Sequence, residues 1–313
     1  MDGLPKPRRY LAVFAISCGT ALNVIDGAIP NVALPTIALD MDVAPSAAVM
    51  IVSVYQLVLV MTLLPFSALG ARIGLRPLYQ YGQALFIVSA VLCFFAPNLP
   101  MLLAARTLQA LGAAAALSVA SALVRSIYPS GQLGRGLGIN SVVVASSAAL
   151  APILGGFIVS VMSWPWVFVA TLPLALLSLA VGQHSLPDPK PRRERYDLLG
   201  ALLCALTFGL IISGLLALAQ GYPPPESLAV ALFGILIACV FVRRELTESA
   251  PILPVDLLAR PILALSIAGA LLAFIGSMTV ILSLPFRLQE QFGFSPGEIG
   301  AVIAPWPLSM MVT

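Results

Sequence analysis

The feature that most constrains this chain is a series of long apolar runs, separated by short clusters of charged residues, Pro and Gly. About 20 apolar residues suffice to cross the hydrocarbon core of a bilayer as an α-helix. Membrane β-strands would be about 10 residues long with alternating polarity, which these runs do not show. With 60% hydrophobic and only 9% charged residues, the chain also has too little polar surface for a soluble fold. We therefore predict an all-α integral membrane protein with spans at Tyr10–Pro35, Ala47–Leu69, Leu78–Ala96, Met101–Val124, Leu137–Met162, Trp166–Val181, Leu198–Ala219, Leu228–Val242, Ile262–Leu284 and Ile299–Thr313.

The Lys and Arg residues are distributed unevenly between the two sides that these spans define. If the N-terminus is cytoplasmic, only Arg287 lies on the outer side and only Arg106 lies within a span. Cytoplasmic loops of membrane proteins carry an excess of Lys and Arg. We therefore predict a multi-pass protein of the cell (inner) membrane with a cytoplasmic N-terminus. The cytoplasmic set is Lys6, Arg8, Arg9, Arg72, Arg76, Arg125, Arg135, Lys190, Arg192, Arg193, Arg195, Arg243, Arg244 and Arg260.

The sequence offers little support for other classes of function. A P-loop is excluded because the only lysines, Lys6 and Lys190, follow no glycine-rich turn. The four cysteines lie singly in apolar runs without metal-ligand spacing, and the 16 bases build no face for nucleic acid. We therefore predict a carrier in the lipid bilayer that is driven by an ion gradient, with no enzymatic activity, cofactor, metal or nucleic-acid partner.

One acid, Asp26, and one base, Arg106, lie within the predicted spans. Each such charge costs about 2.5–3.5 kcal/mol at the middle of a membrane helix. At 1.5 Å per residue, Asp26 lies about 15 Å and Arg106 about 9 Å from the outer ends of their spans, so the long Arg side chain can approach the carboxylate. Two interpretations stay open: a structural pair that ties two helices together, or a protonatable site in a transport pathway, which intramembrane ionisable residues favour.

Polar and helix-breaking residues surround Asp26 in the first apolar run. Asn23 lies one turn before Asp26, and Pro30 lies one turn after it. A proline within a span frees a backbone carbonyl and permits a bend. Pro30 can equally serve only to shape the packing of the helix, and the sequence does not decide between these two roles.

Six short segments follow one another along nearly the whole chain. They read VIDGAIPNVALPTIA, LGARIGLRPLY, ARTLQALGAAAA, SAALAPILGG, SWPWVFVATLP and PILPVDLLARPILALSI. Each alone is a weak signal. In this order, on spans of this orientation, they resemble the major facilitator superfamily and specifically its fourteen-helix drug:proton antiporter branch (QacA/EmrB type).

This resemblance implies three groups of functional residues. In LGARIGLRPLY, however, Ala71 stands where the family has an acid that forms part of a cytoplasmic latch. A latch here would therefore work without that acid, and the alternative is that the remaining arginines only anchor the chain on its cytoplasmic side. The three groups are a proton and substrate pathway at Asn23, Asp26, Arg106 and Gln109, a cytoplasmic loop motif at Arg72, Gly74 and Arg76, and an antiporter motif at Pro152, Gly155 and Gly156.

The resemblance also implies a domain organisation and a function. We expect an N-terminal six-helix bundle at 1–184, a cytoplasmic loop with two extra helices at 185–260, and the start of a C-terminal bundle at 261–313. Because the branch has about four more helices, we expect a fragment, a truncated product or the product of a degenerate gene. The implied function is proton-coupled efflux of small amphipathic or cationic compounds. A proton symporter that imports a small metabolite and a remnant that does not transport remain as alternatives.

Overall fold

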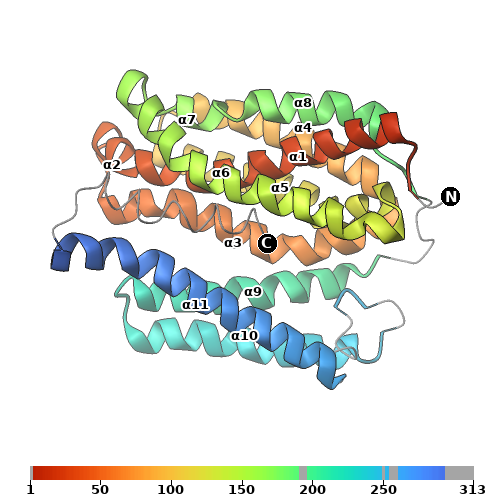
Figure 1. Cartoon of the computed structure of the whole chain (residues 1–313). Coiled ribbons are helices and arrows are strands. Elements are labelled where there is room, and N and C mark those ends of the chain that lie inside the picture. The colour runs from red at the N-terminus through yellow and green to blue at the C-terminus, as the bar shows by residue number, and fades with distance from the viewer. Residues whose placement is uncertain (1–2, 190–195, 249–250, 254–259, 293–313) are drawn as a thin grey trace.

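The computed structural model of the chain describes residues 3–189, 196–248, 251–253 and 260–292. Every regular element in that part of the chain is a helix (Figure 1), so the predicted all-α architecture is confirmed. The helices are α1 (Lys6–Ala28), α2 (Pro30–Asp40), α3 (Pro45–Ile73), α4 (Leu75–Phe94), α5 (Leu99–Ile127), the 3-10 turn η1 (Ser130–Gln132), α6 (Leu133–Val161), α7 (Trp166–Val169), α8 (Leu172–Ser185), α9 (Leu198–Ala219), α10 (Pro224–Glu245) and α11 (Pro261–Phe292).

Eight helical segments of the described part are long and apolar enough to cross a membrane, and α11 adds a shorter apolar stretch at Pro261–Ser277. In α3 and α6 only 17% of the most apolar stretch is buried inside the protein, against 56% in α5. Side chains such as Ile153 and Phe157 of α6 are about two-thirds exposed. Apolar surface of this extent is unfavourable in water. These faces are therefore suited to contact lipid.

Two of the predicted spans are each divided into two helices. The first run breaks at Ile29 into α1 and α2, because Pro30 has no N–H to donate to the carbonyl of Asp26. The run predicted at Trp166–Val181 is divided into α7 and α8, and Pro173 lies in the first turn of α8, where a proline is tolerated. The predicted tenth run, Ile299–Thr313, lies outside the described residues.

The segment predicted as a loop between the second and third spans is almost entirely helical, so that prediction is wrong. Ala71 and Arg72 belong to α3 and Arg76 to α4, and Gly74 alone makes the turn. Gly74 has φ +107°, which residues with a Cβ rarely adopt. A Cβ at this position would also lie 3.1 Å from Oδ1 of Asp188. Glycine therefore permits a turn that is only one residue long.

Close approach between helices depends on small residues. A Cβ added to Gly82 of α4 would lie 2.7 Å from the carbonyl oxygen of Gly112 in α5, and one added to Gly112 would lie 2.8 Å from that of Gly82. Lipid tails provide no hydrophobic drive between membrane helices, so backbone proximity of this kind supplies much of the packing energy. The α4–α5 pair thereby forms a fixed support for the side chains that α5 carries.

The pair of α9 and α10 packs beside α3 (Figure 1). Asp197 caps the N-terminus of α9 by accepting a hydrogen bond from the N–H of Gly200 at 3.0 Å, and it forms an ion pair with Arg244 of α10. Tyr196 donates to the carbonyl of Pro65 in α3 at 3.3 Å. Partial burial acts to raise the pKa of Asp197, but the hydrogen bonds from Arg244 and Gly200 outweigh it and hold that pKa below its usual value. Polar contacts thus fix one end of this pair.

Candidate functional site

Asp26 lies in the last turn of α1, directly before the break at Ile29. Its side chain is fully buried. The missing N–H of Pro30 leaves the backbone carbonyl of Asp26 without its usual helical donor. A carboxylate removed from water needs a charged or hydrogen-bonding partner, because desolvation of an isolated charge is very costly.

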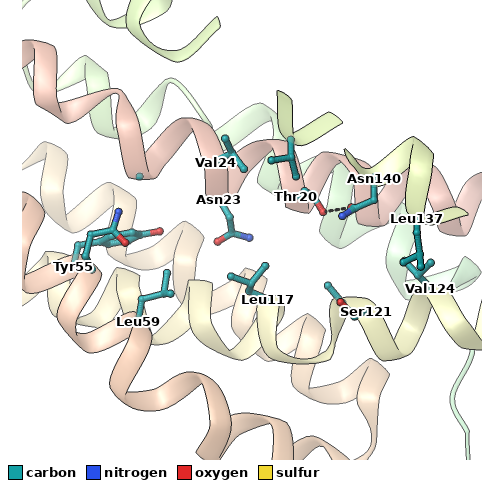
Figure 2. A pocket seen from close by; sticks show the side chains of 14 residues that line it. Thr20, Asn23, Val24, Tyr55, Leu59, Leu117, Ser121, Val124, Leu137 and Asn140 are labelled. Atoms are coloured by element: carbon teal, nitrogen blue, oxygen red, sulfur yellow. Dashed lines mark hydrogen bonds between the residues drawn. The ribbon is translucent and has the colours of Figure 1, made fainter. Parts of the chain in front are cut away.

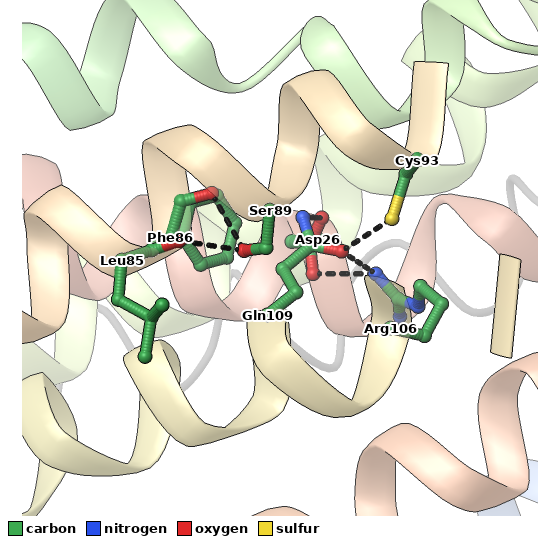
Figure 3. Close-up of polar contacts among 7 residues, drawn as sticks. All are labelled: Asp26, Leu85, Phe86, Ser89, Cys93, Arg106 and Gln109. Carbon is green, nitrogen blue, oxygen red and sulfur yellow. Dashed lines mark hydrogen bonds and ion pairs between the residues drawn. The ribbon is translucent and has the colours of Figure 1, made fainter. Parts of the chain in front are cut away.

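Arg106 and Gln109 of α5 supply these partners (Figure 3). Arg106 Nη1 donates to Asp26 Oδ2 at 3.0 Å and to Gln109 Oε1 at 2.7 Å, while Gln109 Nε2 donates to Asp26 Oδ1 at 3.0 Å. The three side chains are 0% exposed. Arg106 and Gln109 are three residues apart and so share one face of α5. We call Asp26, Arg106 and Gln109 the polar triad.

Two aromatic rings flank the guanidinium of Arg106. The ring of Tyr55 in α3 lies 4.0 Å and that of Phe168 in α7 lies 5.4 Å from its central carbon. Nε and Nη2 of Arg106 have no hydrogen-bond partner among the described residues. Cation–π attraction is strongest where water is excluded, so the rings stabilise the part of the charge that hydrogen bonds leave uncovered.

A cavity of about 260 Å³ lies beside the polar triad, between α1, α3, α5 and α6 (Figure 2). Thr20 donates to Asn140 Oδ1 across it at 3.0 Å. Its lining combines apolar side chains with neutral polar ones and includes Tyr55, whereas no side chain of the polar triad lines it. The neutral polar lining residues are Thr20, Asn23, Gln56, Ser121 and Asn140.

The structure brings together three of the four residues predicted for the pathway, namely Asp26, Arg106 and Gln109. Asn23 lies elsewhere: it lines the cavity and donates to the carbonyl of Gly19 at 2.7 Å. Tyr55 and Phe168 were not predicted from the sequence. Aromatic residues within apolar runs carry no signal of such a contact in one sequence, because it depends on how α3 and α7 pack against α5.

The loop motif lies at the far end of α3, with Arg72 about 25 Å along the helix from Tyr55. Arg76 donates to the carbonyl of Gln183 near the end of α8, and Arg72 is exposed. Arg76 therefore belongs to a contact between helix ends, and neither arginine belongs to the polar triad.

Within the predicted antiporter motif, Gly155 and Gly156 have different surroundings. A Cβ on Gly155 would lie 3.0 Å from the carbonyl oxygen of Ile29, at the junction of α1 and α2, whereas one on Gly156 would meet no heavy atom within 4 Å. Pro152 lies inside α6 and is exposed. Gly155 is thus the member of this motif that allows α6 to approach the break beside Asp26.

The described residues contain no group of three or more His, Cys, Asp or Glu side chains arranged to hold a metal ion. The polar triad holds one acid, one base and one amide, without a nucleophile. It can bind or release a proton at Asp26, and it can exchange an ion pair for a neutral carboxyl group.

Comparisons with known proteins identify the family of this chain. The family model of the Major Facilitator Superfamily matches residues 16–313. The Uncharacterized transporter YebQ of Escherichia coli (strain K12) is 42% identical over 99% of this chain and 68% of its own length. The Riboflavin transporter RibZ of Clostridioides difficile is 27% identical (97% and 66%), and the Multidrug efflux pump LfrA of Mycolicibacterium smegmatis is 29% identical (100% and 63%). The chain thus spans about two-thirds of the length of these relatives.

Solved structures show the same fold. The proton:xylose symporter XylE, bound to 6-bromo-6-deoxy-D-glucose, aligns with a TM-score of 0.58 at 14% identity, over 99% of this chain and 70% of its own. The peptide transporter POT in complex with sulfate aligns with a TM-score of 0.57 at 17% identity, over 77% and 53%. The family match, the 42% identical transporter and the shared helical architecture show that this chain belongs to the Major Facilitator Superfamily of membrane transporters.

Proposed function

We propose that this protein is a proton-coupled exporter of small amphipathic or cationic compounds, a drug:proton antiporter of the fourteen-helix branch in the cell membrane with its N-terminus in the cytoplasm. The observation that carries the proposal is the fully buried carboxylate of Asp26, held by Arg106 and Gln109 beside a cavity. Ionisable groups within the membrane typically mark proton relays and substrate pathways.

The polar triad gives Asp26 two states of different charge. As a carboxylate, Asp26 accepts hydrogen bonds from both Arg106 and Gln109. When a proton binds, the ion pair with Arg106 is lost, while the carboxyl oxygen can still accept from the amide of Gln109. Because Gln109 also accepts from Arg106, it holds the base in place in both states. Proton binding therefore breaks the ion pair between Asp26 of α1 and Arg106 of α5, while the hydrogen bonds of Gln109 to both residues remain.

The cavity and the relatives support the substrate class. Apolar side chains such as Val24, Leu59 and Leu117 line the cavity together with amides and hydroxyls, as a molecule with both apolar and polar parts requires. Among the relatives, LfrA is named a multidrug efflux pump and MdtD of Citrobacter koseri a putative multidrug resistance protein. Part of each such relative extends beyond the length of this chain.

A second candidate, a proton symporter that imports a small metabolite, rests on a different observation. The lining of the cavity carries neutral polar groups such as Asn23 and Gln56 but no acid that would attract a cation. The relative RibZ, moreover, is named a riboflavin transporter. A neutral polar molecule therefore suits the cavity as well.

Vesicles with an imposed pH gradient distinguish these functions. For antiport, an acidic lumen drives a fluorescent cation such as ethidium inward as protons leave, whereas symport needs an alkaline lumen. In the purified protein, Asp26→Asn should reduce gradient-driven uptake to that of protein-free vesicles, because an amide cannot carry a proton. Asp42→Asn, which alters an exposed acid, is the matched control. Undiminished uptake by Asp26→Asn would contradict the proposal. If the unchanged protein shows no uptake under either orientation of the pH gradient, the result would support a remnant that does not transport.

A further inference from the structure

Tyr55 lies between the cavity and the polar triad. Its side chain lines the cavity (Figure 2), and the same ring covers the guanidinium of Arg106 at 4.0 Å. Asp26, by contrast, is fully buried and does not line the cavity. Tyr55 therefore both lines the cavity and contacts the polar triad.

The hydroxyl of Tyr55 is in an unusual position for a buried polar group. Tyr55 is 1% exposed, and its hydroxyl lies close to the carboxylate of Asp26 without the geometry of a full hydrogen bond to it or to any other described residue. Buried hydroxyls are nearly always paired, and an exception calls for an explanation. A movement of the ring would therefore give this hydroxyl a full partner, either the carboxylate of Asp26 or water in the cavity.

Phe168 provides an internal comparison for Tyr55. It packs on Arg106 with its ring 5.4 Å from the guanidinium carbon and is fully buried, but it belongs to α7 and does not line the cavity. The two rings therefore both stabilise the charge of Arg106, and only one of them separates that charge from the cavity. Replacing each ring in turn therefore distinguishes the loss of a cation–π contact with Arg106 from the loss of the side chain that lies between Arg106 and the cavity.

We propose that Tyr55 is a movable partition that couples occupation of the cavity to proton exchange at Asp26. With a substrate against its cavity side, the ring stays on Arg106 and Asp26 keeps its protonation state. When the cavity is empty, the ring can swing aside, and a proton passes from cavity water to a carboxylate oxygen of Asp26. Proton exchange at Asp26 then takes place only while the cavity is empty, so that substrate and proton use the cavity in turn. This inference rests on the proposed proton-coupled function and names the residue that connects its two ligands.

Carboxyl labelling tests the partition without any transport measurement. The protein in membranes is treated at one fixed pH with a water-soluble carbodiimide and an amine, and the modification of Asp26 is followed by mass spectrometry, with Asp26→Asn to confirm the assignment. Tyr55→Leu should speed labelling by about tenfold or more, because a minor open state of about 10% or less becomes the whole population. Tyr55→Phe, which retains the ring, and Phe168→Leu should both label as slowly as the unchanged protein.

Two outcomes would overturn the proposal. Labelling of Tyr55→Leu that stays slow would show that the ring does not separate Asp26 from water. Equally fast labelling of Phe168→Leu would show that lost contact with Arg106, and not an opened path, exposes the acid. Tyr55→Met, whose flexible side chain adapts to irregular space, is a second variant with the same expected result if the leucine variant does not fold. The rate at exposed Asp42 should be the same in every folded variant.

Carboxyl labelling and the vesicle transport assay together separate this inference from the proposed function. If Asp26→Asn transports normally while Tyr55→Leu exposes Asp26, the proposed role of the acid fails and the partition remains. If Asp26→Asn abolishes transport while the Tyr55 variants label slowly, the function stands and the partition fails.

Discussion

Removing the charges of Asp26 and Arg106 singly and together should reveal a strong coupling between them. The two side chains are fully buried with 3.0 Å between Nη1 and Oδ2. Arg106→Met leaves the carboxylate with Gln109 as its remaining hydrogen-bond donor, and Asp26→Asn leaves a guanidinium that already has two nitrogens without partners. Each change strands one buried charge, which costs about 3–5 kcal/mol of folding stability.

The double variant should be far less damaged than the sum of the single ones. It buries no charge and loses hydrogen bonds worth about 1–3 kcal/mol. The expected coupling energy is therefore about 3 kcal/mol or more, well above the error of a double-mutant cycle. In transport assays the double variant should remain inactive, since Asn at position 26 cannot bind a proton.

The cycle can be measured by unfolding in mixed micelles with increasing dodecyl sulfate, monitored by intrinsic fluorescence. Arg72→Met, which alters an exposed base of α3, is the control and should change stability by about 0.5 kcal/mol or less. Additive costs of the two single changes would refute the reasoning, because they would mean that the ion pair is not formed in the folded protein. Restored transport in the double variant would instead assign the pair a purely structural role.

Three further predictions concern packing and the ends of helices. Gly112→Ala should destabilise the protein by about 1–3 kcal/mol by pushing a Cβ into the backbone of α4, while Gly156→Ala, which meets open space, should stay within about 0.5 kcal/mol in the same unfolding assay. Gly74→Ala should cost about 1–3 kcal/mol, because φ +107° is strained for any residue with a Cβ; equal stability would show that the turn can relax. Since the pKa of Asp197 is lowered in the folded protein, its ion pair with Arg244 should add stability above about pH 4 that is lost as the pH falls through the lowered value. An acid unfolding curve that Asp197→Asn leaves unchanged would contradict this.

The sequence predicted the features that depend on order along the chain. The apolar runs indicated the helices, and Asp26 and Arg106 stood out because a charge within a span is costly enough to require a purpose. Their similar depth predicted an approach, and the structure shows a direct contact. Gln109, one turn from Arg106, shares its helical face and joins the same contact for that reason.

Features that depend on how the helices pack against one another could not be predicted from the sequence. Tyr55 is one aromatic residue in an apolar run, and nothing in a single sequence tells that α3 turns this ring toward α5. The segment around Gly74 was predicted as a loop because its glycine and its charges are typical of one. The left-handed backbone of Gly74 instead compresses the connection to one residue, and the arginines on either side become helical.

Two motifs that the sequence presents as separate meet at one point of the structure. The acid at position 26 lies just before the break between α1 and α2, and Gly155 of α6 lies against the carbonyl of Ile29 at that break. Pro30 frees the carbonyl of Asp26, which leaves the junction with fewer hydrogen bonds than a continuous helix would have. A change in the charge of Asp26 therefore acts on a segment that is weak along its own axis and closely packed against α6. The absence of a Cβ at Gly155 allows α6 to approach this junction, so the glycine motif packs beside the helix break that follows Asp26.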